Sequence, residues 1–162
     1  MFRLTRPRTL EQTFPGLSGA DYRISSPQAE AYNWLAWALG DNTQWWEYVS
    51  QPEPGIYWPP DAPCGDNTDA YVGLLASRGF TRCDTAKQEG GYEKIAIYVH
   101  TAKGFGHVAW QNVDGLWWSK LGKSFDIEHA RLDVLESDQW DGYGRAIIFM
   151  KRRRRTTRGC PS

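Results

Sequence analysis

The chain has 162 residues, enough for one domain with a hydrophobic core of its own, and its 19 basic and 19 acidic side chains balance. The balance hides an asymmetry, because the last 12 residues, KRRRRTTRGCPS, hold six basic residues and no acidic one, so the first 150 residues carry a net charge of −6. The chain lacks an apolar run of about 18 residues, and its first residues lack the apolar centre of a secretory signal, so we expect a cytoplasmic protein without a membrane span.

The N-terminal third is predicted to hold one buried helix. Residues 1–24 read as an irregular segment with a turn at FPGLSG. Ser26 and Pro27 are typical of a helix start, which predicts a helix to Leu39, where Gly40 supplies a left-handed end. Both faces of this helix are apolar, which indicates a position at the centre of the domain.

A long loop and a second helix follow. Residues 41–67 are rich in proline and lack periodicity, which is typical of a functional rim. Asp66 or Asn67 is expected to cap a helix that runs through Ser77, and Gly79 with Phe80 predicts a Schellman end.

The second half of the chain changes to the period of two that indicates strands. EKIAIYVH places Ile95, Ile97 and Val99 on one face, and GHVAWQN and LWWSK flank an Asp-Gly hairpin turn. A short helix is expected around Phe125 to Leu135, and GRAIIFMKR is a last strand. The fold class is therefore α+β, a buried N-terminal helix packed on a small antiparallel sheet.

The C-terminal residues are predicted to form a tail. We expect residues 25–150 to form a single α+β domain and residues 151–162 to form a basic, disordered tail. Its arginines are candidates for weak contact with a polyanion: Arg152, Arg153, Arg154 and Arg155. The tail has no aromatic residue for base stacking, which favours a merely solvated end.

The sequence also limits cofactor chemistry. Cys64, Cys83 and Cys160 form no Cys-x-x-Cys pair and no zinc-like spacing with the three histidines. The sequence contains no nucleotide-loop or haem motif, so we expect no metal and no cofactor. The nine tryptophans and eight tyrosines are many for this length, and some of them are expected to line a cleft.

The order of elements matches the framework that a cysteine hydrolase needs. Such an enzyme requires a thiolate near a helix start, a histidine within hydrogen-bond reach, and a third polar group that orients the histidine. Here the buried helix comes first. His107 begins the strand HVAWQN, immediately after the flexible KGFG, and Ser119 and Lys120 lie on its partner strand.

The sequence resembles a family of small, uncharacterised, mostly bacterial domains. The matching segments are FPGL, YNWLAWALGD, WW, YWP, GYEKIAIY, HVA, WWSKLG, IEH and YG, in this order between residue 14 and about residue 152. The helix followed by a histidine strand is more distantly similar to NlpC/P60 and papain-like cysteine hydrolases. This resemblance implies a papain-like fold, with His107 and Ser119 as the catalytic partners of a nucleophile.

The chain departs from the family pattern at the nucleophile. The pattern is Tyr-Asn-Cys, whereas this chain has Trp34 after Asn33. Tryptophan has no nucleophilic atom, and residues 27–44 contain no Cys, Ser or Lys. A site without its nucleophile can only bind a ligand and stabilise an oxyanion. The sequence therefore favours a protein that is not an active enzyme.

Three hypotheses follow. The first is a catalytically silent relative of a cysteine hydrolase that acts as a regulator, a sequestering inhibitor or an immunity-type partner through a Trp-lined cleft. Its ligand-binding residues would be Asn33, Trp34, Trp37, Trp45, Trp46, Trp58, Trp118 and Lys120, with His107 and Ser119 as vestigial catalytic residues. The second is an active amidase or peptidase that uses Cys83 or Cys64 with His107, and the third is a polyanion binder that acts through the tail.

Overall fold

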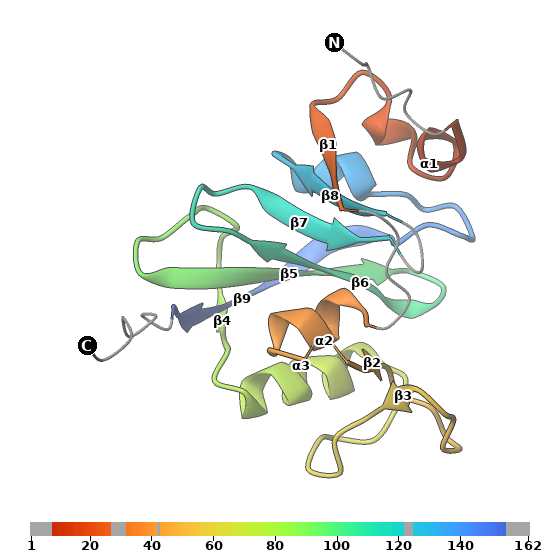
Figure 1. The fold of residues 1–162 in the computed structure, drawn as a ribbon, viewed down its shortest axis with the longest axis vertical. Helices are drawn as coiled ribbons and strands as arrows, with labels where there is room; N and C mark the ends of the chain where they lie inside the picture. The colour runs from red at the N-terminus through yellow and green to blue at the C-terminus, as the bar shows by residue number, and fades with distance from the viewer. Residues whose placement is uncertain (1–7, 27–31, 42, 122–124, 155–162) are drawn as a thin grey trace.

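The computed structural model describes residues 8–26, 32–41, 43–121 and 125–154, and Figure 1 shows the arrangement of its elements. The helical elements are α1 (Arg8–Thr13), η1 (Pro15–Leu17), α2 (Trp34–Ala38), α3 (Thr68–Ser77) and η2 (Leu132–Leu135). The strands are β1 (Tyr22–Ser26), β2 (Trp45–Trp46), β3 (Ile56–Tyr57), β4 (Thr81–Cys83), β5 (Tyr92–His100), β6 (Gly104–Gln111), β7 (Trp117–Lys120), β8 (Asp126–His129) and β9 (Arg145–Arg153).

One antiparallel sheet organises the chain. Its seven strands lie in the order β1-β8-β7-β6-β5-β9-β4, and every neighbouring pair is antiparallel. The predicted hairpin between β6 and β7 is present, with Gly115 at a φ of 82° in its turn. The strands β2 and β3 form a separate parallel pair inside the Pro-rich loop. The mixed α+β class with a mostly antiparallel sheet is thus confirmed.

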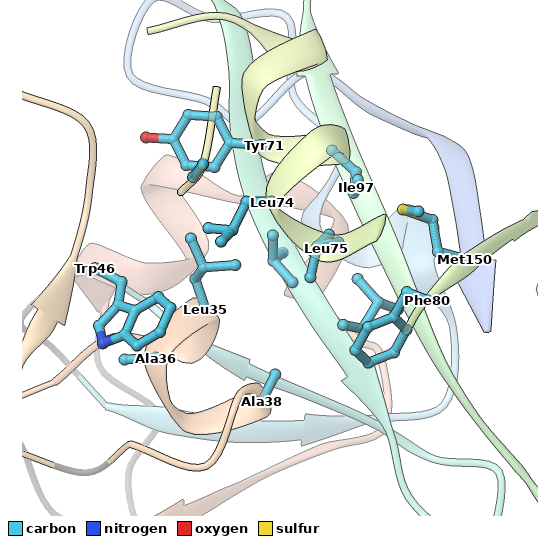
Figure 2. Packing of buried hydrophobic residues seen from close by; sticks show 13 residues of the cluster. Leu35, Ala36, Ala38, Trp46, Tyr71, Leu74, Leu75, Phe80, Ile97 and Met150 are labelled. Atoms are coloured by element: carbon cyan, nitrogen blue, oxygen red, sulfur yellow. The ribbon is translucent and has the colours of Figure 1, made fainter. Parts of the chain in front are cut away.

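Both faces of the sheet are buried. On β5, Ile95 and Ile97 pack into one core, while Ala96 and Tyr98 pack into a second core on the other side. Helices α2 and α3 cover the first face, where Leu35 of α2 meets Leu74 of α3 and the strand residues below them (Figure 2). Elements α1, η1 and η2 cover the second face (Figure 1). The central strands therefore read as near-continuous apolar runs, as expected of strands covered on both sides.

The helix α3 follows the sequence-based expectation closely. The side chain of Asn67 accepts a hydrogen bond from Ala70 N at 2.9 Å, which is the predicted N-cap. At the other end Phe80 N donates to Leu75 O at 3.1 Å, and Gly79 has a φ of 93°. These are the contacts of a Schellman end.

The first helix starts later than the sequence predicts. Ser25 and Ser26 belong to β1, and Ser26 pairs with Asp126 of β8, so Ser26 is not the N-cap. The helix α2 begins at Trp34 because the Asn33 side chain accepts a hydrogen bond from Ala36 N at 3.1 Å. Pro27 lies outside the described residues. Asn33 therefore caps the helix in place of Ser26.

Two other expectations are wrong. Residues 1–24 include the regular elements α1, η1 and part of β1, which dock on the second core through Leu10, Phe14 and Leu17. The helix expected around Phe125 to Leu135 is instead the strand β8 followed by the short turn η2. Strand β8 forms because it pairs with a strand on each side, β7 and β1. The periodicity of its own residues does not reveal these partners.

The basic C-terminus is partly structured. Strand β9 runs through Arg153, so the first three residues of the expected tail belong to the sheet. Arg152 donates from Nε to Glu93 at 2.9 Å, and Arg154 lies over the Trp110 ring and donates to Gln111 O. Arg155 lies outside the described residues. Within the described residues, no helix is long and apolar enough to cross a membrane.

Candidate functional site

A cavity of about 370 Å³ lies beside the start of α2. The segments that bound it are the start of α2, strand β2, the start of α3, strand β6 and the loop before β9. Its aromatic lining residues are Trp34, Trp45, Trp46, Tyr71, Phe105 and Tyr143. Its charged lining residues are Glu47, Asp66, Lys103, Lys120 and Asp141, and its other polar lining side chains are Asn33 and His107.

The sheet itself opens at this cavity. Strands β6 and β7 share only two residue pairs, Trp110 with Trp118 and Gln111 with Trp117. Strand β7 then continues along β8 as far as Lys120, which pairs with Asp126. Lys120 on β7 and His107 on β6 therefore line the cavity where the two strands diverge.

Asn33 fixes one wall of the cavity. Its Oδ1 caps α2 and also accepts from Trp46 N at 3.2 Å, while its Nδ2 donates to Trp46 O at 2.7 Å. This side chain thus joins the start of α2 to β2. Both adjacent tryptophans, Trp34 and Trp46, are held against the cavity as a result.

Trp34 lines the cavity at the position where the resemblance found in the sequence led us to expect a cysteine. It is the first residue of α2, only 5% of its surface is exposed, and its ring meets the ring edges of Trp37 and Trp118 at 4.7 and 6.2 Å. Its indole Nε1 is buried and has no hydrogen-bond partner among the described residues. A buried indole N–H without an acceptor is uncommon, because it forfeits its hydrogen bond to water.

His107, on β6, also lines the cavity and is held by an aromatic contact. Its ring stacks on Tyr143 with the ring centroids 4.2 Å apart and the planes 6° from parallel. Gly106 permits this approach, because a Cβ there would lie 2.1 Å from Tyr143 O. Burial, with a smaller contribution from the nearby His129, lowers the pKa of His107 to about 3. His107 is therefore neutral at neutral pH, and its Nε2 has no hydrogen-bond partner among the described residues.

Ser119 does not orient His107. Its hydroxyl lies 2.9 Å from Nε2 of His129, and Nδ1 of His129 lies 2.8 Å from Arg131 O. The carbonyl can only accept, so Nδ1 carries the proton and the Ser119 hydroxyl donates to Nε2. Ser119 is fully buried and does not line the cavity. The predicted contact of Ser119 with His107 is thus replaced by a hydrogen bond to His129.

The chain can now be placed in a family. The family model described as a domain of unknown function (DUF7689) matches residues 23–151. The chain belongs to the DUF7689 family. No curated protein and no solved structure matches the chain at a significant level.

The DUF7689 region contains the whole cavity lining, from Asn33 to Tyr143. Of the residues that the sequence proposed for ligand contact or catalysis, the structure brings six to the cavity: Asn33, Trp34, Trp45, Trp46, His107 and Lys120. Trp37 and Trp118 instead stack on each other behind Trp34, and Trp58 donates from its indole to Pro63 O. Lys120 is buried and paired with Asp126 at 3.4 Å, so its charge is already balanced.

The thiols of this DUF7689 domain lie away from the cavity. Cys83 is on the edge strand β4, with β9 and β5 between it and β6. Neighbouring strands are about 4.8 Å apart, so Cys83 lies roughly 14 Å across the sheet from the strand of His107. Cys64 is exposed in the Pro-rich loop and does not line the cavity, and Cys160 is outside the described residues. This placement offers no support for a hydrolase that uses Cys83 or Cys64.

Sequence reasoning missed the rest of the lining. Tyr71 stacks on Phe105 with centroids 3.6 Å apart, and Tyr143 stacks on His107. Glu47, Asp66 and Asp141 add carboxylates. The YG segment at 143–144 was the available signal for Tyr143. Tyr71 lies on α3 and Phe105 on β6, whereas Glu47, Asp66 and Asp141 reach the cavity from loops whose path the sequence does not reveal.

Proposed function

We propose that this chain is a catalytically silent relative of the cysteine hydrolases, and that it binds a ligand in the aromatic cavity instead of cleaving one. The observation that carries the proposal is that Trp34 and His107 line the same cavity. The nucleophile position and the base position of the resemblance thus meet at one site. The first of them holds an indole, which cannot attack a carbonyl.

The state of His107 also favours binding over catalysis. A general base works best with a pKa near the operating pH, whereas burial holds the pKa of His107 near 3. A third group should orient the imidazole, but Ser119 bonds to His129 instead. The indole at position 34, the low pKa of His107 and the hydrogen bond of Ser119 to His129 each remove one part of the catalytic arrangement, and the cavity is still present.

The finer likeness, a papain-like or NlpC/P60-like architecture, is part of this proposal. It is supported by the order of elements: a short buried helix that begins at Trp34, then a strand with His107, then a partner strand with Ser119. The seven-stranded antiparallel sheet is compatible with this layout. Layout alone does not establish an activity, so the test must measure chemistry and binding directly.

The chemical test uses the full chain and a panel of fluorogenic amide and ester substrates. We expect no turnover that iodoacetamide abolishes, and no change in residual turnover after His107→Ala. Cys64→Ala, Cys83→Ala and Cys160→Ala in one chain should likewise change nothing. Turnover that requires both His107 and a cysteine would refute the proposal and support an active enzyme.

The binding test follows the indole N–H resonances of the chain during a fragment screen. We expect at least one fragment to shift the Trp34 resonance saturably, with the resonance assigned through Trp34→Phe. The resonance of Trp117 is an internal control, because this residue packs in the second core on the other face of the sheet and does not line the cavity. A screen in which no fragment moves Trp34 more than Trp117 would contradict a binding role for this cavity.

A further inference from the structure

We infer that the cavity recognises an organic cation that carries a hydrogen-bond acceptor near its charge, such as a lysine-type or methylated ammonium group beside a carbonyl. This inference rests on the proposed function, because it names the chemical class of the ligand that the same cavity binds. Four features of the described residues support it: carboxylates without an ion pair, hydrogen-bonded lysines, aromatic rings without a protein cation and two unpartnered buried nitrogens.

Three carboxylates line the cavity. Glu47, Asp66 and Asp141 are exposed lining residues, and none of them forms an ion pair among the described residues. Burial raises the pKa of Glu47, a hydrogen bond from the Trp45 side chain lowers it, and the nearby charges of Asp66 and Glu53 raise it further. A cation in the cavity would relieve the repulsion between Glu47 and Asp66, whereas an anion would increase it.

The two lysines at the cavity are already engaged. Lys120 is almost fully buried, and its ammonium pairs with Asp126 at 3.4 Å. The Lys103 ammonium donates to Gly142 O at 3.2 Å and also to Trp140 O, in the loop that forms one wall. The expectation that Lys120 meets a carboxylate or phosphate ligand is therefore not favoured, because its charge is balanced within the protein.

Five aromatic residues of the cavity lining hold no cation from the described part of the chain over their rings, although Tyr71 stacks on Phe105 and Tyr143 stacks on His107. This chain places Arg or Lys over aromatic rings at several other sites, for example Arg152 over Phe80 at 4.3 Å. Among the described residues, Trp34, Trp45, Tyr71, Phe105 and Tyr143 have no such cation. Aromatic rings together with carboxylates are the usual means of recognising ammonium groups.

Two buried nitrogens in the cavity lining indicate that the ligand carries a hydrogen-bonding group as well as a positive charge. Trp34 Nε1 is a donor without an acceptor, and His107 Nε2 is a buried nitrogen without a partner; both residues line the cavity and are less than a tenth exposed. An indole N–H can bond only to an acceptor, so the ligand must bring one, such as a carbonyl oxygen. The neutral imidazole can serve as donor or acceptor according to its tautomer.

The experiment titrates the full chain with Nα-acetyl-lysinamide and its Nζ-trimethyl form. The neutral probe Nα-acetyl-norleucinamide and the anionic probe Nα-acetyl-glutamate are titrated in parallel. We expect saturable shifts of the Trp34 indole resonance with the cationic probes only, and weaker binding as salt is raised. The triple variant Glu47→Gln, Asp66→Asn, Asp141→Asn should weaken cation binding on the order of tenfold.

A control variant separates the local effect from total charge. Asp21→Asn, Asp84→Asn and Asp114→Asn together remove the same charge from exposed residues that do not line this cavity, and the Kd should change less than about twofold. Binding of the neutral or anionic probe at least as tight as that of the cations would overturn the inference while leaving a binding role for the cavity intact. An unchanged Kd in the cavity triple, or no binding of either cation, would also overturn it. Thiol-dependent turnover would instead refute the proposed function itself.

Discussion

The Ser119 hydroxyl donates to Nε2 of His129 across β7 and β8, over a distance of 2.9 Å. The two side chains are diagonal neighbours on one face of the sheet, since Ser119 pairs with Ile127 and His129 pairs with Trp117. Both are at most 1% exposed. The pair has the atoms of a serine nucleophile and its base, but both side chains are buried and Ser119 does not line the cavity of His107, so the pair has a structural role.

Loss of the Ser119 hydroxyl should therefore cost stability. In Ser119→Ala the buried Nε2 of His129 loses its partner, and we expect the free energy of unfolding in urea to fall by about 1–3 kcal/mol. Ser50→Ala is the control, because Ser50 is exposed and its side chain forms no hydrogen bond among the described residues, and it should change stability by less than about 0.5 kcal/mol. Equal stability of the two variants would show that the hydrogen bond contributes nothing.

Stability should also fall on mild acidification. Burial holds the pKa of His107 near 3 and that of His129 near 4, below the value of 6.5 in an unfolded chain. Between these values the unfolded chain binds more protons than the folded chain, so the free energy of unfolding rises with pH. The stabilisation is complete above about pH 6.5 and is lost as the pH falls toward 4. Each histidine contributes a slope of up to about 1.4 kcal/mol per pH unit.

Urea unfolding at pH 7, 6 and 5 measures this slope while most carboxylates remain ionised. His129→Gln should reduce the slope by about half. His100→Gln is the control for replacing a buried histidine by glutamine: His100 is also buried and hydrogen-bonded to Gln139 O, and the slope that His107 and His129 contribute should persist in this variant. A pH-independent stability between pH 5 and 7 would contradict the neutral, buried state of both histidines.

The sequence predicted local structure well wherever one segment decides it. The cap and the Schellman end of α3 depend on Asn67, Gly79 and Phe80 alone, and all three behave as expected. The alternation in β5 is likewise local. Strand β8 was mistaken for a helix because its state depends on partners from β1 and β7, which lie far away in the sequence.

The candidate site shows the same division. Asn33, Trp34 and His107 were recognisable because they occupy motif positions. The partner of Ser119 was not, because the strand order and the side of the sheet decide between His107 and His129. The carboxylates Glu47 and Asp141 reach the cavity from loops, and loop paths leave no periodic signal in a sequence.

Asn33 should contribute more to stability than an ordinary N-cap. Asn33→Ala removes the cap of α2 and both hydrogen bonds to Trp46, so we expect a loss of about 2–4 kcal/mol. Asn67→Ala removes only the cap of α3 and should cost about 1 kcal/mol. Urea unfolding of the two variants measures the difference. Equal losses would mean that the link to β2 is energetically neutral.

Arg152 should act as a structural residue of the sheet rather than as part of a polyanion-binding tail. Its guanidinium donates to Glu93, to Arg78 O at the end of α3 and to Ala38 O at the end of α2. Arg152→Ala leaves the largely buried Glu93 carboxylate without its partner, so we expect a loss of about 2–4 kcal/mol in urea unfolding.

Two further variants make the Arg152 prediction specific. Arg153→Ala removes the same charge from the next residue, which is exposed and contacts only the Tyr92 ring, so stability should fall by less than about 1 kcal/mol. Glu93→Gln added to Arg152→Ala should recover part of the loss, because it neutralises the stranded carboxylate. If Arg152→Ala and Arg153→Ala destabilise the chain equally, the contacts of Arg152 with the two helix ends do not hold the fold together, and residues 151–153 act as a solvated basic segment.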